Sequence, residues 1–231
     1  MTHKNLIIVQ CRLNSKRLPG KALYPICGIP MLTFLLRRLQ CGLNTNDFKI
    51  IVATTKLEGD NLVNIWAQEE NIEIIKGEEN DVLKRFVQCL DCYSANTVVR
   101  ATADNPLTCP EIIQWLVKER NERNVDYVLC KNLPVGAGVD VFSSDLLRRL
   151  DSEAKNADER EHINLYLLRH LQRFNTFFPK AKGKIARPDI RITVDTEDDW
   201  ENIRALFKKT ENEPWKLSIH EAVKRMDNRC I

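Results

Sequence analysis

The chain has 231 residues, which is enough for one sizeable α/β domain with an added arm but cramped for two full domains. Its 35 lysine and arginine residues against 32 aspartate and glutamate residues leave a net charge of +3, a balance that does not favour nucleic acid as a partner. The sequence opens without a charged and then apolar leader, and no apolar run approaches the roughly 18 residues of a membrane span. We therefore expect a soluble, cytoplasmic protein with no membrane role of its own.

Apolar runs of strand length alternate with helical patterns along the first 130 residues, which is typical of a sheet covered by helices on both faces. The expected strands cover residues 6–9, 48–53, 72–75, 97–101 and 126–130. One helix is expected to begin at Gly28, and further helices are expected over residues 60–70, 81–93 and 111–121. Further on, the pattern predicts a short strand up to Phe142, helices over 143–150 and 158–169, strands over 174–178 and 184–194, and a helix capped by Thr196.

Positive charge is concentrated in the loop that follows the first strand. That strand ends at Gln10, Pro19 and Gly20 bend the loop, and its cationic residues are Arg12, Lys16, Arg17 and Lys21. Ligands of open α/β sheets bind beyond the carboxyl ends of the strands, and arginine and lysine are the donors that phosphate groups need. The loop is therefore a candidate site for a polyanion such as a triphosphate. On charge alone, a solvated basic surface loop remains the alternative.

The same loop carries a resemblance to a known family. The pattern Arg12-x-x-Ser15-x-Arg17-Leu-Pro-Gly-Lys21 after a strand ending in Gln10 resembles the signature of cytidylyltransferases related to spore coat polysaccharide biosynthesis protein F. More broadly it is similar to the CMP-Kdo and CMP-acylneuraminate synthetases, and it is neither a Walker loop nor a GxGxxG motif. The resemblance implies that Arg12, Arg17 and Lys21 hold the phosphates of CTP and act in catalysis, while Gln10 and Ser15 contribute to nucleotide binding.

Two further segments are candidates for the nucleotide pocket. Thr54 follows the expected strand 48–53, where a hydroxyl contacts a base or ribose or simply caps the strand end. Residues 77–86 read GEENDVLKRF; helix capping and compensation of the helix dipole explain their acidic side chains. The stretch also resembles the Glu-Asp-Asp-Val-Leu-x-Arg-Phe pattern of the family, which implies that Asp81 and Arg85 lie near the base or ribose. Asn80 stands where that pattern has an aspartate.

Two aspartates at strand ends are candidate magnesium ligands. Asp104 lies in RATADNPL after the strand 97–101, where a carboxylate suits Mg²⁺ and an aspartate-led turn before Pro106 is the alternative. The stretch resembles the Arg-x-Thr-x-Asp-x-Pro-Leu motif of the family, whose aspartate binds the metal. The resemblance implies that Asp104 is a metal ligand and that Arg100 lies near the nucleotide. The capping of the last helix explains the other acidic residues of the segment RITVDTEDD but leaves Asp195 without a structural role. The segment resembles another family motif, and the resemblance implies that Asp195 is the second ligand.

The region from residue 133 to 184 resembles the acceptor side of the family. It keeps an acid at Asp140 before Val141-Phe142, but has Val135 and Gly138 where the family pattern has aspartates. The triplet Arg160-Glu161-His162 matches a family triplet, so Arg160, His162 and Asp140 are expected to bind the acceptor. The Thr-Pro that usually follows is replaced by Asn164-Leu165, so we expect the helix to continue.

His162 is also the only plausible histidine base. The other three histidines have no expected role at the site, because His3 and His220 lie at the periphery and His170 lies on an amphipathic helix face. A lone histidine on such a helix is more often structural.

Taken together, the resemblance implies a three-layer α/β nucleotidyltransferase fold of the glycosyltransferase-A type, Rossmann-like, with a mostly parallel sheet. It implies a single domain over residues 1–231, with 133–184 as a protruding arm that builds a homodimer and faces the acceptor. It further implies Mg²⁺-dependent transfer of CMP from CTP to a sugar acid or related acceptor in polysaccharide biosynthesis, with pyrophosphate leaving. A phosphate or phosphonate acceptor, another nucleotide such as UTP, and a non-catalytic nucleotide-binding protein remain alternatives.

Overall fold

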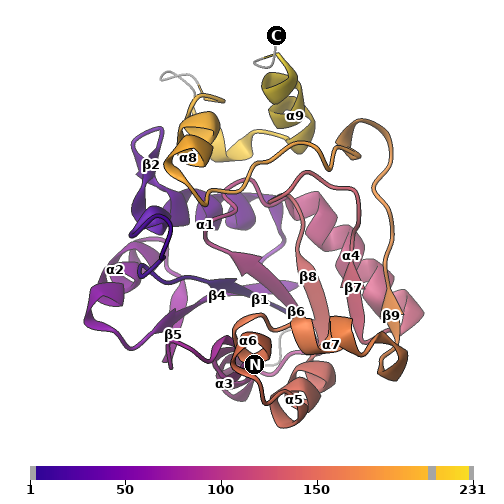
Figure 1. The fold of residues 1–231 in the computed structure, drawn as a ribbon. Coiled ribbons are helices and arrows are strands. Elements are labelled where there is room, and N and C mark those ends of the chain that lie inside the picture. Colours follow the sequence, from indigo (N-terminus) through magenta and orange to yellow (C-terminus); the bar gives the residue numbers. More distant parts are fainter. Residues whose placement is uncertain (1–3, 208–211, 229–231) are drawn as a thin grey trace.

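The computed structural model describes residues 4–207 and 212–228, which form an α/β structure around a seven-stranded sheet (Figure 1). The strand order is β5-β4-β1-β6-β8-β7-β9. Only β8 runs antiparallel to both of its neighbours, so the expected mostly parallel sheet is confirmed. The strands are β1 (Asn5–Gln10), β4 (Phe48–Thr55), β5 (Glu73–Gly77), β6 (Thr97–Thr102), β7 (Tyr127–Leu129), β8 (Asp140–Ser143) and β9 (Thr176–Phe177).

Helices cover both faces of the sheet (Figure 1). They are α1 (Met31–Gly42), α2 (Asn61–Glu69), α3 (Val82–Cys92), α4 (Pro110–Arg123), α5 (Ser144–Glu153), α6 (Ala157–Glu161), α7 (Leu165–Arg169), α8 (Glu197–Arg204) and α9 (Ile219–Asp227). Short 3₁₀ helices are η1 (Lys21–Leu23), η2 (Glu58–Asp60), η3 (Leu171–Arg173), η4 (Gly183–Ile185) and η5 (Pro214–Lys216).

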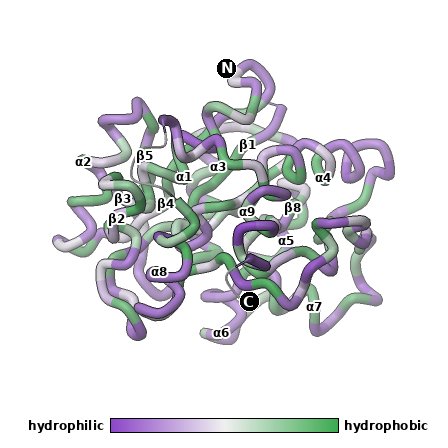
Figure 2. Tube along the Cα trace, turned by 90° about the horizontal axis from the view of Figure 1, so that it is seen from above, coloured by the Kyte–Doolittle hydropathy of each residue, from purple (hydrophilic) through white to green (hydrophobic). Residues whose placement is uncertain are grey.

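Alternation along the central strands divides the core into two layers. Ile7 and Val9 of β1 pack with α1, α2, α4 and α9, whereas Leu6 and Ile8 of the same strand pack with α3 and α5. Successive side chains of a strand point to opposite faces, so a strand that is apolar at every position must be covered on both sides. Figure 2 shows the hydrophobic residues concentrated along the inner strands and the hydrophilic residues along the outer loops.

The carboxyl ends of the central strands lie level with one another. Gln10, the last residue of β1, pairs with Ala53 on one side and with Thr102 on the other. Because β8 runs the opposite way, its first residue, Asp140, lies opposite Arg100 of β6 at the same edge of the sheet. The loop after β1, the turn after β6 and the start of β8 are therefore brought together.

The capping predictions are confirmed at two helices. Asp81 accepts a hydrogen bond from the backbone N–H of Lys84 at the start of α3, and Thr196 forms a reciprocal capping box with Asp199 at the start of α8. Each cap satisfies an N–H group that the helix itself leaves without a partner.

Two boundaries differ from the sequence prediction. The helix expected from Gly28 begins at Met31, because Cys27 and Gly28 both have positive φ and turn the chain between β2 (Pro25–Ile26) and β3 (Ile29–Pro30). The strand expected over 184–194 is absent from the described residues, where η4 and a turn ending at Ile190 stand instead. Pro188 has no N–H to donate to a strand ladder, and only Arg191 forms a bridge, with Val135.

The helix expected over 158–169 is also interrupted, which corrects the prediction that it continues past His162. It divides into α6 and α7, with His162 after α6 and Asn164 before α7. The side-chain amide of Asn164 donates to Asp140 Oδ1 at 2.8 Å, and this contact with β8 replaces a helix-internal arrangement. Asn164 therefore fixes the break without the Thr-Pro pair of the family.

Residues 133–184 do not form a protruding arm in the structure of this chain. They contribute β8 to the interior of the sheet, between β6 and β7, and α5 to the layer that packs against α3. A dimerisation arm over residues 133–184 is therefore not shown by the structure of this chain. Among the described helices, none is long and apolar enough to cross a membrane.

Candidate active site

The loop after β1 is closed by hydrogen bonds to one carbonyl. The carbonyl oxygen of Leu13 accepts the N–H groups of Ser15 and Gly20, each at 2.8 Å. Gly20 has a φ of 72°, a left-handed conformation that suits glycine, and η1 begins directly after it at Lys21. The closed loop therefore delivers Arg17 and Lys21 to the edge of the sheet where the strands end.

Lys21 is the centre of the site. Its Nζ donates to Asp104 Oδ2 at 2.7 Å, to Asp195 Oδ1 at 2.8 Å and to the carbonyl of Val194 at 2.8 Å. The N–H of Val194 in turn donates to the carbonyl of Asp104 at 2.8 Å, which holds the two segments side by side. Three residues that are far apart in the sequence, and that the sequence nominated separately, thus meet around one ammonium group.

Asp195 lies among three cations. Besides Lys21, its carboxylate contacts Arg17 Nη2 at 2.7 Å and Arg191 Nη2 at 2.5 Å. Burial alone would raise the pKa of Asp195, but the hydrogen bond and charge of Lys21, together with Arg191 and Arg17, outweigh it and lower the pKa. The carboxyl is therefore held in its ionised form.

A hydrogen-bond network joins β1, β6 and β8 across the floor of the site. Arg100 Nε donates to Gln10 Oε1 at 3.2 Å, and Arg100 Nη1 donates to Asp140 Oδ2 at 3.2 Å. The other oxygen of Asp140 accepts from the buried Tyr127 hydroxyl and from Asn164. Burial and the charge of Asp140 raise the pKa of Tyr127 well above its ordinary value, so the hydroxyl stays a donor. Asp140 thus orients Arg100 toward the cavity.

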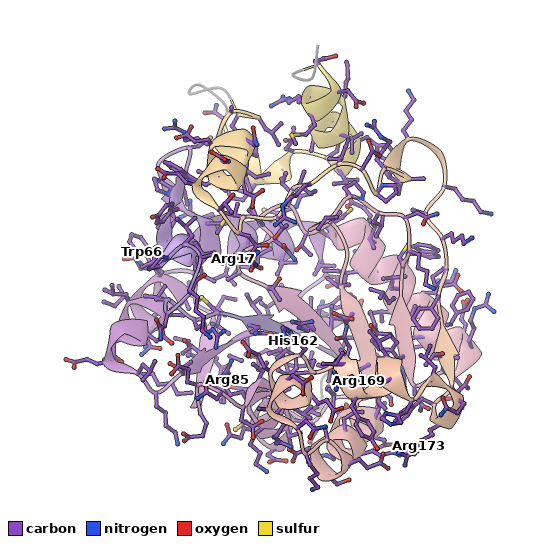
Figure 3. The ribbon with its side chains drawn as sticks, in the orientation of Figure 1. Arg17, Trp66, Arg85, His162, Arg169 and Arg173 are labelled. Atoms are coloured by element: carbon purple, nitrogen blue, oxygen red, sulfur yellow. The ribbon has the colours of Figure 1, made fainter. Side chains whose placement is uncertain are left out.

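Helix α6 reaches the phosphate loop through Glu161. Its Oε1 accepts a hydrogen bond from Arg12 Nη2 at 2.7 Å, and the neighbouring His162 also faces the site. His170 is structural, because its ring stacks on Tyr166 with centroids 4.4 Å apart, and His3 lies outside the described residues. Figure 3 shows His162 near the middle of the view and Arg173 toward the lower right.

The structure places Arg160 and Asp81 outside this cavity. Arg160 Nε donates to Asp81 Oδ2 at 2.7 Å, and its other nitrogens bond Asp151 and the carbonyl of Ala154. Neither Arg160 nor Asp81 lines the cavity around Lys21. The hydrogen bonds of the Arg160 guanidinium instead join α6 to α3 and α5, so an acceptor-binding role of Arg160 does not follow from its position.

Thr54 and Arg85 are likewise not brought to the cavity. Thr54 is fully buried, and among the described residues its hydroxyl has no hydrogen-bond partner. Arg85 is also fully buried, and its Nη1 donates to the carbonyls of Glu78 and Glu79. Burial, with a smaller contribution from Arg12, lowers the pKa of Arg85. A direct contact of either side chain with the base, as the sequence suggested, does not follow from these positions.

The remaining candidates line a single cavity of about 570 Å³ at the strand ends. Its cationic side chains outnumber its carboxylates, which suits a polyanionic ligand. The predicted residues that line it are Gln10, Arg12, Ser15, Arg17, Lys21, Arg100, Asp104, Asp140, His162 and Asp195. Arg17 is the most exposed of the ion-paired cations there, with 66% of its side chain accessible, against 11% for Lys21.

Two lining residues were missed by the sequence reasoning. Arg191 opens the motif that ends in Asp195, and in the structure it bonds both Asp195 and Asp199. Glu161 lies between two residues that were nominated, and it pairs with Arg12. Both belong to the quoted motifs, so the signal was present, but only the contacts show which cations they meet.

The carboxylates fit a magnesium ion shared with phosphate. Asp104 and Asp195 are hard oxygen donors that lie within one hydrogen bond of the same ammonium and face the same cavity. Mg²⁺ usually takes one or two carboxylates together with waters and substrate phosphates. The described residues contain no group of three or more side chains that could hold a metal ion.

Comparisons with known proteins agree with this geometry. The sequence model of the cytidylyltransferase family matches residues 6–222. The spore coat polysaccharide biosynthesis protein SpsF of Bacillus subtilis is 30% identical over 212 residues, covering 90% of this chain and 88% of the relative.

Among solved structures, a cytidylyltransferase from Leptospira borgpetersenii superposes with a TM-score of 0.89 at 24% identity, covering 99% of this chain and 95% of that chain. A CMP:2-keto-3-deoxy-manno-octonic acid synthetase complexed with CTP superposes with a TM-score of 0.65 at 19% identity, covering 88% and 98%. At these identities the likeness concerns the fold, and it confirms the α/β nucleotidyltransferase architecture.

Proposed function

Because this chain belongs to the cytidylyltransferase family, we propose that it transfers the CMP group of CTP to an acceptor oxygen and releases pyrophosphate. The observation that carries the proposal is the Lys21 ammonium, held between Asp104 and Asp195 beside an arginine-containing loop. All three N–H groups of the Lys21 ammonium are used in these contacts, so a bound phosphate group would take over one of them and place the positive charge between phosphate and carboxylate, which is the charge arrangement that phosphoryl chemistry needs.

The residues of the loop supply the electrostatics of the reaction. An acceptor oxygen attacks the α-phosphorus, and the bond from that phosphorus to the bridging oxygen of the pyrophosphate group breaks. Negative charge spreads over the phosphate oxygens as this happens, so fixed cations near them lower the barrier. Arg12, Arg17 and Lys21 line the cavity from one wall and are the groups we assign to that role.

Asp104 and Asp195 would hold Mg²⁺ in the active enzyme. The bound ion would neutralise phosphate charge and orient the triphosphate. In this structure both carboxylates bind the ammonium of Lys21. Arg17 and Arg191 also contact Asp195 and favour its ionised form.

The acceptor is proposed to be a sugar acid or a related compound used for a surface polysaccharide. The name of the Bacillus relative refers to spore coat polysaccharide, and that of one structural neighbour to a keto sugar acid. A sugar hydroxyl must lose a proton during attack, and His162 is the described histidine that faces the cavity. A phosphate or phosphonate acceptor arrives ionised and needs no such base, so it remains the second candidate.

The wider organisation stays a prediction. We infer one nucleotidyltransferase domain over the whole chain, with residues 133–184 on the acceptor side, where Asp140 and His162 line the cavity. We also propose a homodimer, which the family resemblance implies, and a cytoplasmic location. Sedimentation equilibrium of the purified chain would test the dimer, and a monomer at all concentrations would contradict it.

The test of function is pyrophosphate release with Mg²⁺, each of the four ribonucleoside triphosphates, and a panel of sugar acids, sugar phosphates and phosphonates. We expect release with CTP and one acceptor class. Release only with UTP would overturn the choice of base, whereas tight CTP binding without release in any combination would favour a binding protein.

The dependence on His162 separates the two acceptor classes. His162→Gln should lower kcat for transfer to a hydroxyl acceptor strongly, whereas the Kd for CTP should change little. Transfer to a phosphate or phosphonate acceptor at an undiminished rate would instead point to the second candidate.

A further inference from the structure

A buried carboxylate lies directly under the phosphate loop. Asp60 belongs to η2, is 1% exposed and does not line the cavity. Its Oδ1 accepts the backbone N–H of Leu13 at 2.8 Å, and its Oδ2 accepts the hydroxyl of Thr55 at the end of β4. A buried carboxylate is costly unless it is hydrogen-bonded, so its presence here calls for a reason.

Leu13 is the residue on which the loop closes. Its carbonyl accepts Ser15 and Gly20, so the ring of chain that contains Arg17 is tied at one peptide. The N–H of the same residue is the group that Asp60 binds. Asp60 therefore fixes the position of the closed loop relative to β4 and the sheet, although it touches none of the cations that face the cavity.

A buried cation lies in the same region. Arg85 is fully buried in α3; burial lowers its pKa, and the negative charge of Asp60 acts against that effect. Arg85 also donates to the carbonyls of Glu78 and Glu79 in the loop after β5. This gives Arg85 a place in the site that needs no contact with a nucleotide.

We propose that Asp60 is the positioning residue of the phosphate loop: by holding the Leu13 N–H it keeps Arg17 and Lys21 in their productive places. The inference rests on the proposed function for its effect on catalysis. Its structural half, the anchoring of Leu13, stands on the contacts alone.

Three variants separate positioning from stability. Asp60→Ala removes the acceptor and the charge, whereas Asp60→Asn keeps an oxygen for the Leu13 N–H and removes only the charge. Ser143→Ala is the matched control, because Ser143 is also buried and its hydroxyl also accepts a backbone N–H, that of Leu146, but at α5 and outside the cavity. All three are expected to lower the unfolding temperature.

Only one variant should affect turnover strongly. A misplacement of about 1 Å in a catalytic group costs roughly 10²-fold, so Asp60→Ala should lower kcat/KM for CTP by about that factor. Asp60→Asn should lose less than roughly fivefold, since the hydrogen bond that positions the loop remains. Equal losses in the Ala and Asn variants, or a similar loss in Ser143→Ala, would overturn the proposal.

Amide hydrogen exchange at Leu13 tests the anchor without any nucleotide. The Leu13 amide of the wild type should exchange as slowly as the amides of β1, and should become fast in Asp60→Ala but not in Asp60→Asn. Fast exchange in the wild type would overturn the proposal even if the Ala variant does not fold. If the wild type shows this protection but releases no pyrophosphate, the proposed function fails while the anchor stands.

Discussion

At the scale of single residues, Lys21 is the central residue of the candidate site. It is largely buried and bonds two carboxylates, so its ammonium has one position, whereas the exposed Arg17 has freedom to move. Lysine presents a compact charge that a phosphate oxygen can meet directly. The difference in exposure separates two cations that the sequence motif treats alike.

Replacement of Lys21 by alanine should therefore be severe. We expect Lys21→Ala to lower kcat for pyrophosphate release by roughly 10²- to 10³-fold, by analogy with the loss of one donor to a developing oxyanion. Lys118→Ala, which removes an exposed ammonium that pairs with Glu122 on α4, is the control and should leave kcat unchanged. A loss of only a few fold in the Lys21 variant would remove this residue from the catalytic machinery.

The ionisation of Asp195 predicts an acid limb of stability. Its pKa in the folded protein is lowered below the unfolded value of about 3.9, because Lys21, Arg191 and Arg17 outweigh its burial. A group with a lowered folded pKa contributes stability above its unfolded pKa, and that contribution is lost as the pH falls through the folded pKa. As the pH falls below about 4, the free energy of unfolding should thus fall less steeply in Asp195→Asn than in the wild type.

Urea titrations of both proteins at several acid pH values measure those slopes. Equal slopes would mean that the carboxyl of Asp195 titrates alike in the folded and unfolded chains, in conflict with the contacts seen here.

At the scale of elements, α6 depends on one arginine. Arg160 bonds Asp81 at the start of α3, and Asp151 and Ala154 near the end of α5, so it ties a five-residue helix to two longer ones. A helix this short does not hold itself together in water. Arg160 therefore helps to hold Glu161 and His162 beside the cavity, together with the pairs that Asp158 and Glu159 form with Arg169.

Arg160→Met should destabilise the protein by about 2 kcal/mol, since several hydrogen bonds to charged or carbonyl groups are lost and two carboxylates lose a partner. Arg148→Met is the matched control, because Arg148 makes one exposed ion pair with Asp91, worth about 1 kcal/mol or less. Denaturant unfolding measures both. An Arg160 variant no less stable than the Arg148 variant would show that α6 is held by its other contacts.

Elements also show where reasoning from the sequence succeeds. The strands around β1 were predicted because they contain nearly continuous apolar runs, and the caps of α3 and α8 because Asp81 and Thr196 precede them. The break between α6 and α7 was not predicted, since it depends on Asn164 reaching Asp140 on β8. Contacts between distant segments leave no local pattern.

The same distinction applies to the candidate site. Lys21, Asp104 and Asp195 were nominated from strand ends and family motifs, and the structure brings them together. Asp60 was not nominated, because its role lies in one backbone N–H that belongs to another loop. Thr54 and Arg160 were nominated but point into the core and toward α3, since a motif specifies a residue type and not its direction.

At the scale of the whole molecule, the topology of the sheet makes the site. The parallel neighbours β1 and β6 end level, and the reversed strand β8 begins at the same edge of the sheet, so these three strands and the loops next to them line the cavity. The segment after α7 then returns above them and adds Arg191 and Asp195 (Figure 1). The loop after β1 and the segment that carries Arg191 and Asp195 thus meet at Lys21.

The most direct test of the account follows the phosphates of CTP through one turnover. CTP labelled in the α-phosphate and, separately, in the γ-phosphate is incubated with Mg²⁺, an acceptor that supports pyrophosphate release in the panel, and either the wild type or Asp104→Asn. With the wild type, we expect the α label to enter the acceptor and the γ label to leave in pyrophosphate. With Asp104→Asn, we expect both processes to be much slower. Release of the γ label as orthophosphate, or full activity of Asp104→Asn, would contradict this expectation.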